Sequence, residues 1–258
     1  MPNRATAPRA SRATIVIWIV LLVLAALGWA VTVFEARSMR QMADMSGMPG
    51  MPGMPGASSS GFLFLSVWTA MMVAMMFPSV APAAAAVAAP GESRRQAGRP
   101  TARAWSFLFG YLTIWSVVGV VAYLLSLIVP DVGMAGPGLR VSRPAIGALI
   151  LIIAGVYQWS PLKTRFLGNC RSPLGFVRQE WGTGVAGAFR LGIAHGAQCV
   201  GCCGALMLVL LAVGMMDLAW MALVAAIIFA EKVVPSGPFV GRVAGAAFLA
   251  SGIAMVVT

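Results

Sequence analysis

Charged residues are scarce in this sequence of 258 residues. Only 10% of the side chains are Asp, Glu, Lys or Arg and 60% are hydrophobic, with a mean hydropathy of +0.89. Since soluble domains carry roughly a quarter charged residues, this deficit excludes an ordinary soluble domain and predicts a membrane protein. The sequence also lacks a phosphate-binding glycine-rich loop, a hydrolase triad and an acidic pair, so it shows neither an ATP-driven element nor a hydrolytic centre.

Seven apolar segments are each expected to form a membrane-spanning helix. The first, residues 15–34, lacks a clean signal-peptide cleavage site and is interpreted as a retained anchor. Loops are expected at residues 130–143, rich in Pro and Gly, and at residues 160–173, which are basic. The segments cover residues 15–34, 61–87, 104–129, 144–159, 186–214, 218–230 and 239–257.

The expected fold is therefore an all-α, polytopic transmembrane helix bundle with three parts. Residues 1–34 are the basic N-terminus and first transmembrane helix, residues 35–60 an external Met-rich linker, and residues 61–258 a six-helix transmembrane domain that carries the expected metal site.

The cations predict how this bundle lies in the membrane. With seven spans and the N-terminus inside, fourteen of the eighteen Lys and Arg residues fall on the inner side. This asymmetry predicts an N-in, C-out orientation. The membrane accounts for the net charge of +11, so no nucleic acid partner is expected.

Cysteine and histidine are rare, yet one short run holds most of them. The nine residues His195-Gly-Ala-Gln-Cys-Val-Gly-Cys-Cys203 contain three of the four cysteines and the only histidine. Clustering of this kind is not the pattern of a secreted disulfide framework. At about 100° per residue, His195, Cys199, Cys202 and Cys203 share an arc of roughly 100° on one helix face.

Thiolates and imidazole favour soft or borderline ions, so this run predicts a transition-metal site, with copper favoured and zinc as the alternative. Donors on one straight helix cannot all reach one ion, so a second segment is expected to complete the shell. The alternative is that the cysteines are inert packing residues at a helix interface. Small residues recur at every fourth position along the lower half of this helix, which predicts close approach of a neighbouring helix: Gly184, Ala188, Gly192 and Gly196.

Methionines are the expected source of further donors. Four of them in the second span lie at a similar depth to the cysteines, although methionine also fills membrane interfaces well: Met71, Met72, Met75 and Met76. Six others recur at every third position of the external linker, where a polyproline II conformation would place their sulfurs on one side for Cu(I) capture. A flexible low-complexity linker is the alternative. These six are Met39, Met42, Met45, Met48, Met51 and Met54.

Three residues at the inner face are weaker candidates. Cys170 lies in the basic loop, where neighbouring cations would favour its thiolate, although a lone loop cysteine is usually incidental. Glu231 and Lys232 end the sixth span. A local ion pair or a snorkelling pair is the favoured interpretation of these two residues, and a proton or ligand role the alternative.

These residues resemble a bacterial family of predicted metal-binding integral membrane proteins of unknown function, over about residues 62–257. The resemblance implies a metal-binding role for His195, Cys199, Cys202 and Cys203. Two positions depart from it, because family members carry a cysteine where this chain has Phe166 and often a tryptophan where it has Gly204. The segments that carry the resemblance are Met71-Met-Val-Ala-Met-Met-Phe-Pro-Ser79, Tyr157-Gln-Trp-Ser-Pro-Leu-Lys163, Cys170-Arg-Ser-Pro-Leu-Gly-Phe176, His195 to Cys203 with Leu206-Met207, and Glu231-Lys232.

The sequence thus predicts a membrane protein that binds a soft metal, with the lipid bilayer, the metal ion and a metal-handling protein as partners and no enzymatic activity. One rival is a membrane thiol-disulfide oxidoreductase that uses Cys199-Val-Gly-Cys202, with Cys203 as a resolving thiol. The outer segments hold no second cysteine pair for such a relay. The other rival is a structural protein without metal.

Overall fold

The structure, a computed structural model, describes residues 12–46, 61–88, 100–128, 132–135, 138–141, 144–172, 184–215 and 217–257. Within these ranges the chain forms eight α-helices and one short β-hairpin, so the expected all-α class is confirmed. The elements are α1 (Arg12–Ser46), α2 (Gly61–Ala88), α3 (Pro100–Ile128), β1 (Val132–Ala135), β2 (Gly138–Val141), α4 (Pro144–Gln158), α5 (Pro161–Arg171), α7 (Gly184–Val213), α8 (Leu218–Val233) and α9 (Gly237–Val257).

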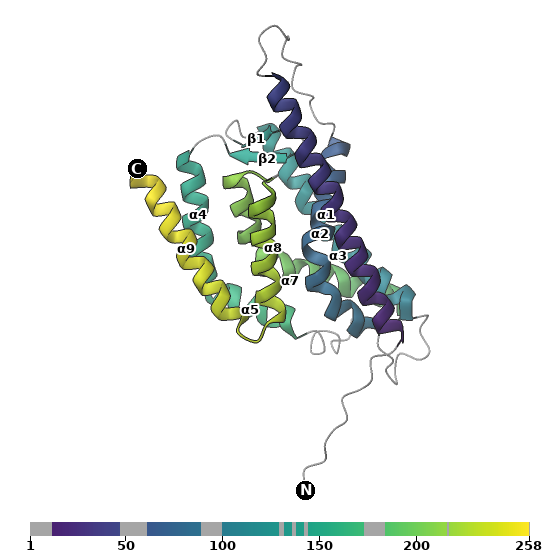
Figure 1. Ribbon diagram of the computed structural model, residues 1–258. Coiled ribbons are helices and arrows are strands. Elements are labelled where there is room, and N and C mark those ends of the chain that lie inside the picture. Colours follow the sequence, from purple (N-terminus) through teal and green to yellow (C-terminus); the bar gives the residue numbers. More distant parts are fainter. Residues whose placement is uncertain are drawn as a thin grey trace.

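The helices form a bundle, with the hairpin at one end and α5 at the other (Figure 1). α1, α2 and α3 pack side by side on one flank, while α4 and α9 pack together on the opposite flank. α7 and α8 lie between the two groups, and α7 contacts α3, α4, α5 and α8. α7 is therefore the element around which the interior is built.

Five helices are long and apolar enough to cross a membrane, namely α1, α2, α3, α7 and α9. α4 and α5 pass the same test together and make a sixth span if the bent pair is counted as one. α8 has 16 residues, which at 1.5 Å per residue gives about 24 Å, short of a hydrocarbon core of about 30 Å. The chain is consistent with a multi-pass membrane protein, and length and composition support five or six of the seven expected spans.

Glycines allow α3 and α7 to pack closely, as the pattern of small residues predicted. A Cβ on Gly192 would overlap the carbonyl oxygen of Phe107, and a Cβ on Gly196 would lie 3.0 Å from Cβ of Ile114. The later residue of α7, Gly196, faces the later residue of α3, Ile114, so the two helices run in the same direction. This packing brings Tyr111 of α3 against the middle of α7.

Two stretches predicted to be loops contain regular structure. Much of the basic loop expected at residues 160–173 forms α5, and β1 and β2 occupy most of the loop expected at residues 130–143. In addition, α1 continues past residue 34 to Ser46, because residues 35–46 contain no glycine or proline to stop it. The first three methionines of the linker repeat therefore lie on a helix, and the Met-Pro-Gly units from Met48 onward lie outside the described residues.

α5 begins at a helix start that the sequence encodes. The side chain of Ser160 accepts a hydrogen bond of 3.1 Å from the backbone nitrogen of Lys163, and Pro161 is the first helical residue. Serine at the N-cap and proline at the next position are both strongly preferred. The chain bends by 66° between α4 and α5, so that α5 packs against α7 and α8.

Candidate metal centre

Three cysteine sulfurs form a compact group on α7. The Sγ atoms of Cys199, Cys202 and Cys203 all lie within 4.8 Å of one another, and those of Cys199 and Cys203 are 3.6 Å apart. Each of the three residues is at most 1% exposed. The spacings of three and four residues thus place the sulfurs on one buried face of the helix, as the sequence predicted.

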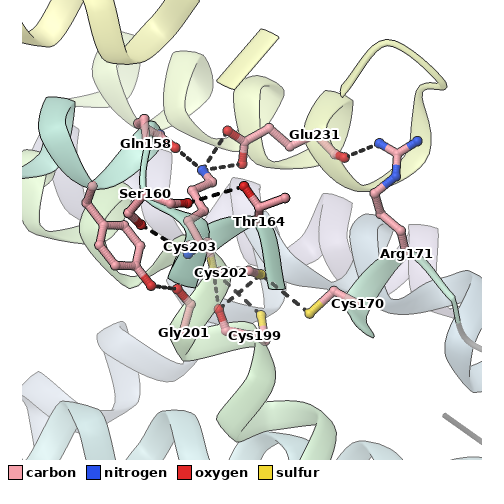
Figure 2. Close-up of polar contacts among 12 residues, drawn as sticks. Gln158, Ser160, Thr164, Cys170, Arg171, Cys199, Gly201, Cys202, Cys203 and Glu231 are labelled. Carbon is pink, nitrogen blue, oxygen red and sulfur yellow. Dashed lines mark hydrogen bonds and ion pairs between the residues drawn. The ribbon is translucent and has the colours of Figure 1, made fainter. Parts of the chain in front are cut away.

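A fourth sulfur reaches this group from α5. The Sγ atoms of Cys170 and Cys202 lie 3.4 Å apart, although 32 residues separate them in the sequence (Figure 2). All four cysteines are free thiols and all are buried. The interpretation of Cys170 as an incidental loop residue is therefore wrong, because α5 carries its sulfur to the cluster.

Phe166 occupies the position at which the resembling proteins carry a cysteine. Its ring lies on the backbone of α7, since a Cβ on Gly201 would be 2.7 Å from ring atoms. The hydroxyl of Tyr157 donates a hydrogen bond of 2.6 Å to the carbonyl of the same glycine. Gly201 is thus the point where α4 and α5 both meet α7, directly before Cys202.

Two polar side chains meet the sulfur of Cys199. The ammonium of Lys232, at the end of α8, donates to this sulfur over 3.0 Å. The hydroxyl of Tyr111, which is fully buried on α3, lies at the same distance of 3.0 Å. The sulfur of Cys199 therefore lies between a cation from α8 and a hydroxyl from α3.

A buried ion pair lies beside the cysteines. Lys163 of α5 donates to both carboxylate oxygens of Glu231, at 2.7 and 2.8 Å, and also to the side-chain carbonyl of Gln158 (Figure 2). The favoured interpretation of a local pair between Glu231 and Lys232 is wrong, because Glu231 pairs with α5 while Lys232 turns to Cys199.

His195 is buried but lies outside the three-sulfur group. It is 3% exposed, and its ring centroid is 5.6 Å from that of Phe107 and 6.0 Å from that of Tyr111. Among the described residues, the ligand atoms that all lie within 4.8 Å of one another are the three cysteine sulfurs. A ligand role for His195 stays a prediction.

The methionines of the second span lie in the interior on a different helix. Each of the four is at most 2% exposed: Met71, Met72, Met75 and Met76. Their helix, α2, packs mainly against α1, α3 and α8. The second segment expected beside the cysteines is therefore α5, and a donor role for the α2 methionines stays a prediction.

The sulfur separations suit a shared ion. With metal–sulfur bonds of about 2.3 Å, the value for zinc, sulfurs around one ion lie about 3.8 to 4.0 Å apart. The three sulfurs of α7 lie within 4.8 Å of one another, with those of Cys199 and Cys203 3.6 Å apart, so a shared ion needs only small side-chain adjustments. The sulfur of Cys170 is 3.4 Å from that of Cys202 but lies outside this three-sulfur group. Soft thiolate donors of this kind select Cu(I) or Zn(II) over hard cations.

From the sequence, Tyr111 was missed, and Cys170 and Lys232 were named but not placed at the cysteine cluster. The Ser160-Pro161 start signal was available and would have predicted the helix that carries Cys170. The contacts of Lys232 and Tyr111 with Cys199 had no local signal, because they join residues 33 and 88 positions apart.

Fold and site together define a class, that of polytopic helical proteins with a buried thiol cluster suited to a soft metal. A family model, PpoB2, described as a copper chaperone, matches residues 65–255, and the chain belongs to this family. Its description supports the expected membership of a metal-binding family. No curated protein and no solved structure matches the chain.

Proposed function

We propose that this protein binds Cu(I) inside a membrane, through the thiolates of Cys199, Cys202 and Cys203, and hands the ion to a metal-handling partner protein. The observation that carries the proposal is the group of three buried sulfurs within 4.8 Å of one another. The family description favours copper over zinc. His195, one helical turn before Cys199, is a further candidate donor that we propose on the same helix.

The surroundings of the sulfurs support a metal role over plain packing. Several thiolates around one monovalent ion carry a net negative charge, which is expensive in a membrane interior unless it is compensated. Lys232 supplies a positive charge at 3.0 Å from one sulfur. Inert cysteines in an apolar interface would need no such partner.

For the membrane topology we propose seven crossings with the N-terminus on the inner side. α3 and α7 run in the same direction, and α4 and α9 run in opposite directions, since Gly155 packs on Gly245 while Ala148 packs on Gly252. If the chain crosses the membrane in alternating directions through α1, α2, α3, α4, α7, α8 and α9, then α3 and α7 are parallel and α4 and α9 are antiparallel, as observed. The uneven distribution of Lys and Arg supports the orientation and an inner bacterial membrane.

We further propose thioether donors for the delivery of copper. The linker methionines would capture Cu(I) outside, and those of α2 would hold it on the way to the cysteines. Thioethers suit this step because they bind Cu(I) and do not form disulfides. The complete burial of the four α2 methionines supports a site shielded from water.

The test is a metal count on the purified full-length protein in detergent. The protein is reduced and loaded with Cu(I) or Zn(II) in competition with a chelator, and bound metal is measured by mass spectrometry. We expect stoichiometric Cu(I) in the wild type and its loss in the Cys199→Ser/Cys202→Ser/Cys203→Ser variant. Leu208→Ala, an exposed position on the same helix, is the matched control and should bind as the wild type does.

Copper retained by the triple variant would overturn the proposed site. If the wild type holds no metal, the metal function fails, and titration of the thiols with a quinone then separates the oxidoreductase from a structural protein. Deletion of residues 39–54 tests external capture, and is expected to slow loading at low copper concentration without lowering the final stoichiometry.

A further inference from the structure

Glu231 contacts both ends of α5. Its carboxylate accepts hydrogen bonds from Lys163 in the first turn of that helix, at 2.7 and 2.8 Å. Its backbone carbonyl accepts a hydrogen bond of 2.6 Å from Arg171, the last residue of the helix (Figure 2). The second guanidinium nitrogen of Arg171 donates to the carbonyl of Pro235 at 3.2 Å. One residue of α8 therefore fixes α5 at two points.

Each of these contacts has a physical reason. The carbonyl of Glu231 belongs to the last turn of α8, where carbonyls have no partner within the helix and cations are favourable. The ion pair is buried, with side chains 4% and 2% exposed, so neither charge has water as an alternative partner. Gly241 of α9 leaves the space that the carboxylate fills, since a Cβ there would overlap it.

The second contact point of Glu231 adjoins Cys170. Arg171 follows Cys170 directly, and Cys170 is the residue whose sulfur lies 3.4 Å from Cys202. A helix that is held at both ends can neither rotate nor slide freely. The contacts of Glu231 thus tie the helix that carries the Cys170 sulfur to α8 at both ends.

We propose that Glu231 is a positioning residue of the metal centre, which holds α5 at both ends so that Cys170 adds a sulfur from a second helix to those of α7. This inference rests on the proposed function, because it assigns Cys170 to the shell of the bound Cu(I). It also gives the adjacent residues Glu231 and Lys232 separate tasks, since Glu231 holds α5 while Lys232 meets the sulfur of Cys199.

The test measures the position of Cys170 relative to Cys202 and the affinity for Cu(I) in separate experiments. In a Cys199→Ser/Cys203→Ser background, the two remaining thiols, Cys170 and Cys202, are crosslinked with dibromobimane in the full-length, metal-free protein. The main variant, Lys163→Met/Glu231→Gln, removes both charges and so leaves no unpaired buried charge. Arg171→Gln is the second variant, and Arg165→Gln, exposed on the same helix, is the matched control.

We expect crosslinking to slow about tenfold or more in the main variant and in Arg171→Gln, and to be unchanged in the control. In the protein with all four cysteines, the main variant should raise the Kd for Cu(I) roughly 10- to 100-fold, and we expect the same of Cys170→Ser. Adding the main variant to Cys170→Ser should then weaken binding no further, because both changes remove the same donor.

Unchanged crosslinking in both variants would overturn the positioning role of Glu231. Fully additive effects on the Kd would overturn it as well, since Glu231 would then act independently of Cys170. Failure of the proposed function gives a different result: Cys170 and Cys202 crosslink as expected in the Cys199→Ser/Cys203→Ser background, but the wild-type protein binds no Cu(I).

Discussion

The ammonium of Lys232 lies 3.0 Å from the sulfur of Cys199, and this contact joins the end of α8 to the middle of α7. Lysine in a membrane-spanning bundle is costly, and its head usually reaches for the interface. Here it instead turns inward to a sulfur that Tyr111 also contacts at 3.0 Å. The arrangement is the one expected for a site that must hold negative charge in the interior.

Replacing Lys232 by methionine should weaken Cu(I) binding roughly 10- to 100-fold. Methionine keeps most of the side-chain volume but removes the positive charge, so the thiolates around the ion lose their compensation in a medium of low dielectric constant. The measurement is a competition titration of the purified protein against a chromophoric Cu(I) chelator.

Lys232→Arg is the control for charge, and should retain most of the affinity because the positive charge remains. Equal weakening by the arginine and methionine variants would show that shape, and not charge, makes this lysine necessary.

The buried Lys163–Glu231 ion pair predicts that removing one of its charges destabilises the protein more than removing both. Lys163→Met leaves a buried carboxylate without its cation, which should cost about 3–5 kcal/mol of the free energy of unfolding. Lys163→Met/Glu231→Gln removes both charges and should recover much of that loss. Thermal unfolding of the two variants in the same detergent measures the difference, and a single variant at least as stable as the double one would contradict it.

The fold followed from the sequence where long apolar segments were present. The expected helices at residues 61–87, 104–129 and 239–257 are observed within a few residues as α2, α3 and α9. The helix over residues 161–171 was missed because its cations, proline and glycine are typical of a loop, while its stability comes from the Ser160 cap and from packing against α7 and α8. Capping is visible in a sequence, but such packing is not.

The candidate site was predictable only along one helix. Spacings of three and four residues gave the common face of Cys199, Cys202 and Cys203, because a helix repeats every 3.6 residues. Cys170 and Lys232 reach the same place from two other helices, and their approach depends on the bend before α5 and on the length of α8. The sequence indicates where α8 begins and nearly where it ends, but it carries no local signal for the angle of the bend before α5.

The contact between Gly201 of α7 and Phe166 of α5 predicts that a substitution at one position can be rescued by a substitution at the other. In Gly201→Ala the new Cβ would lie 2.7 Å from the phenyl ring, so α5 must move away from α7. We expect slower crosslinking of Cys170 to Cys202 and a cost of about 1–3 kcal/mol in stability from overpacking. Gly201→Ala/Phe166→Leu should restore both, because the smaller side chain leaves room for the methyl group. Absence of rescue would show that the phenyl ring of Phe166 is not what excludes a side chain at position 201.

Substitution of the α2 methionines tests whether their sulfurs deliver copper to the cysteines. Leucine at Met71, Met72, Met75 and Met76 keeps the interior apolar, at a cost below about 1.5 kcal/mol for each exchange, but removes every thioether. If these sulfurs pass Cu(I) to the cysteines, the variant should reach the same final copper content more slowly. Stopped-flow loading of protein in lipid nanodiscs measures that rate. Met221→Leu, a fully buried exchange on α8, is the control for packing. A lower final copper content would instead place a thioether among the ligands of the bound ion, and an unchanged rate would leave the α2 methionines as packing residues.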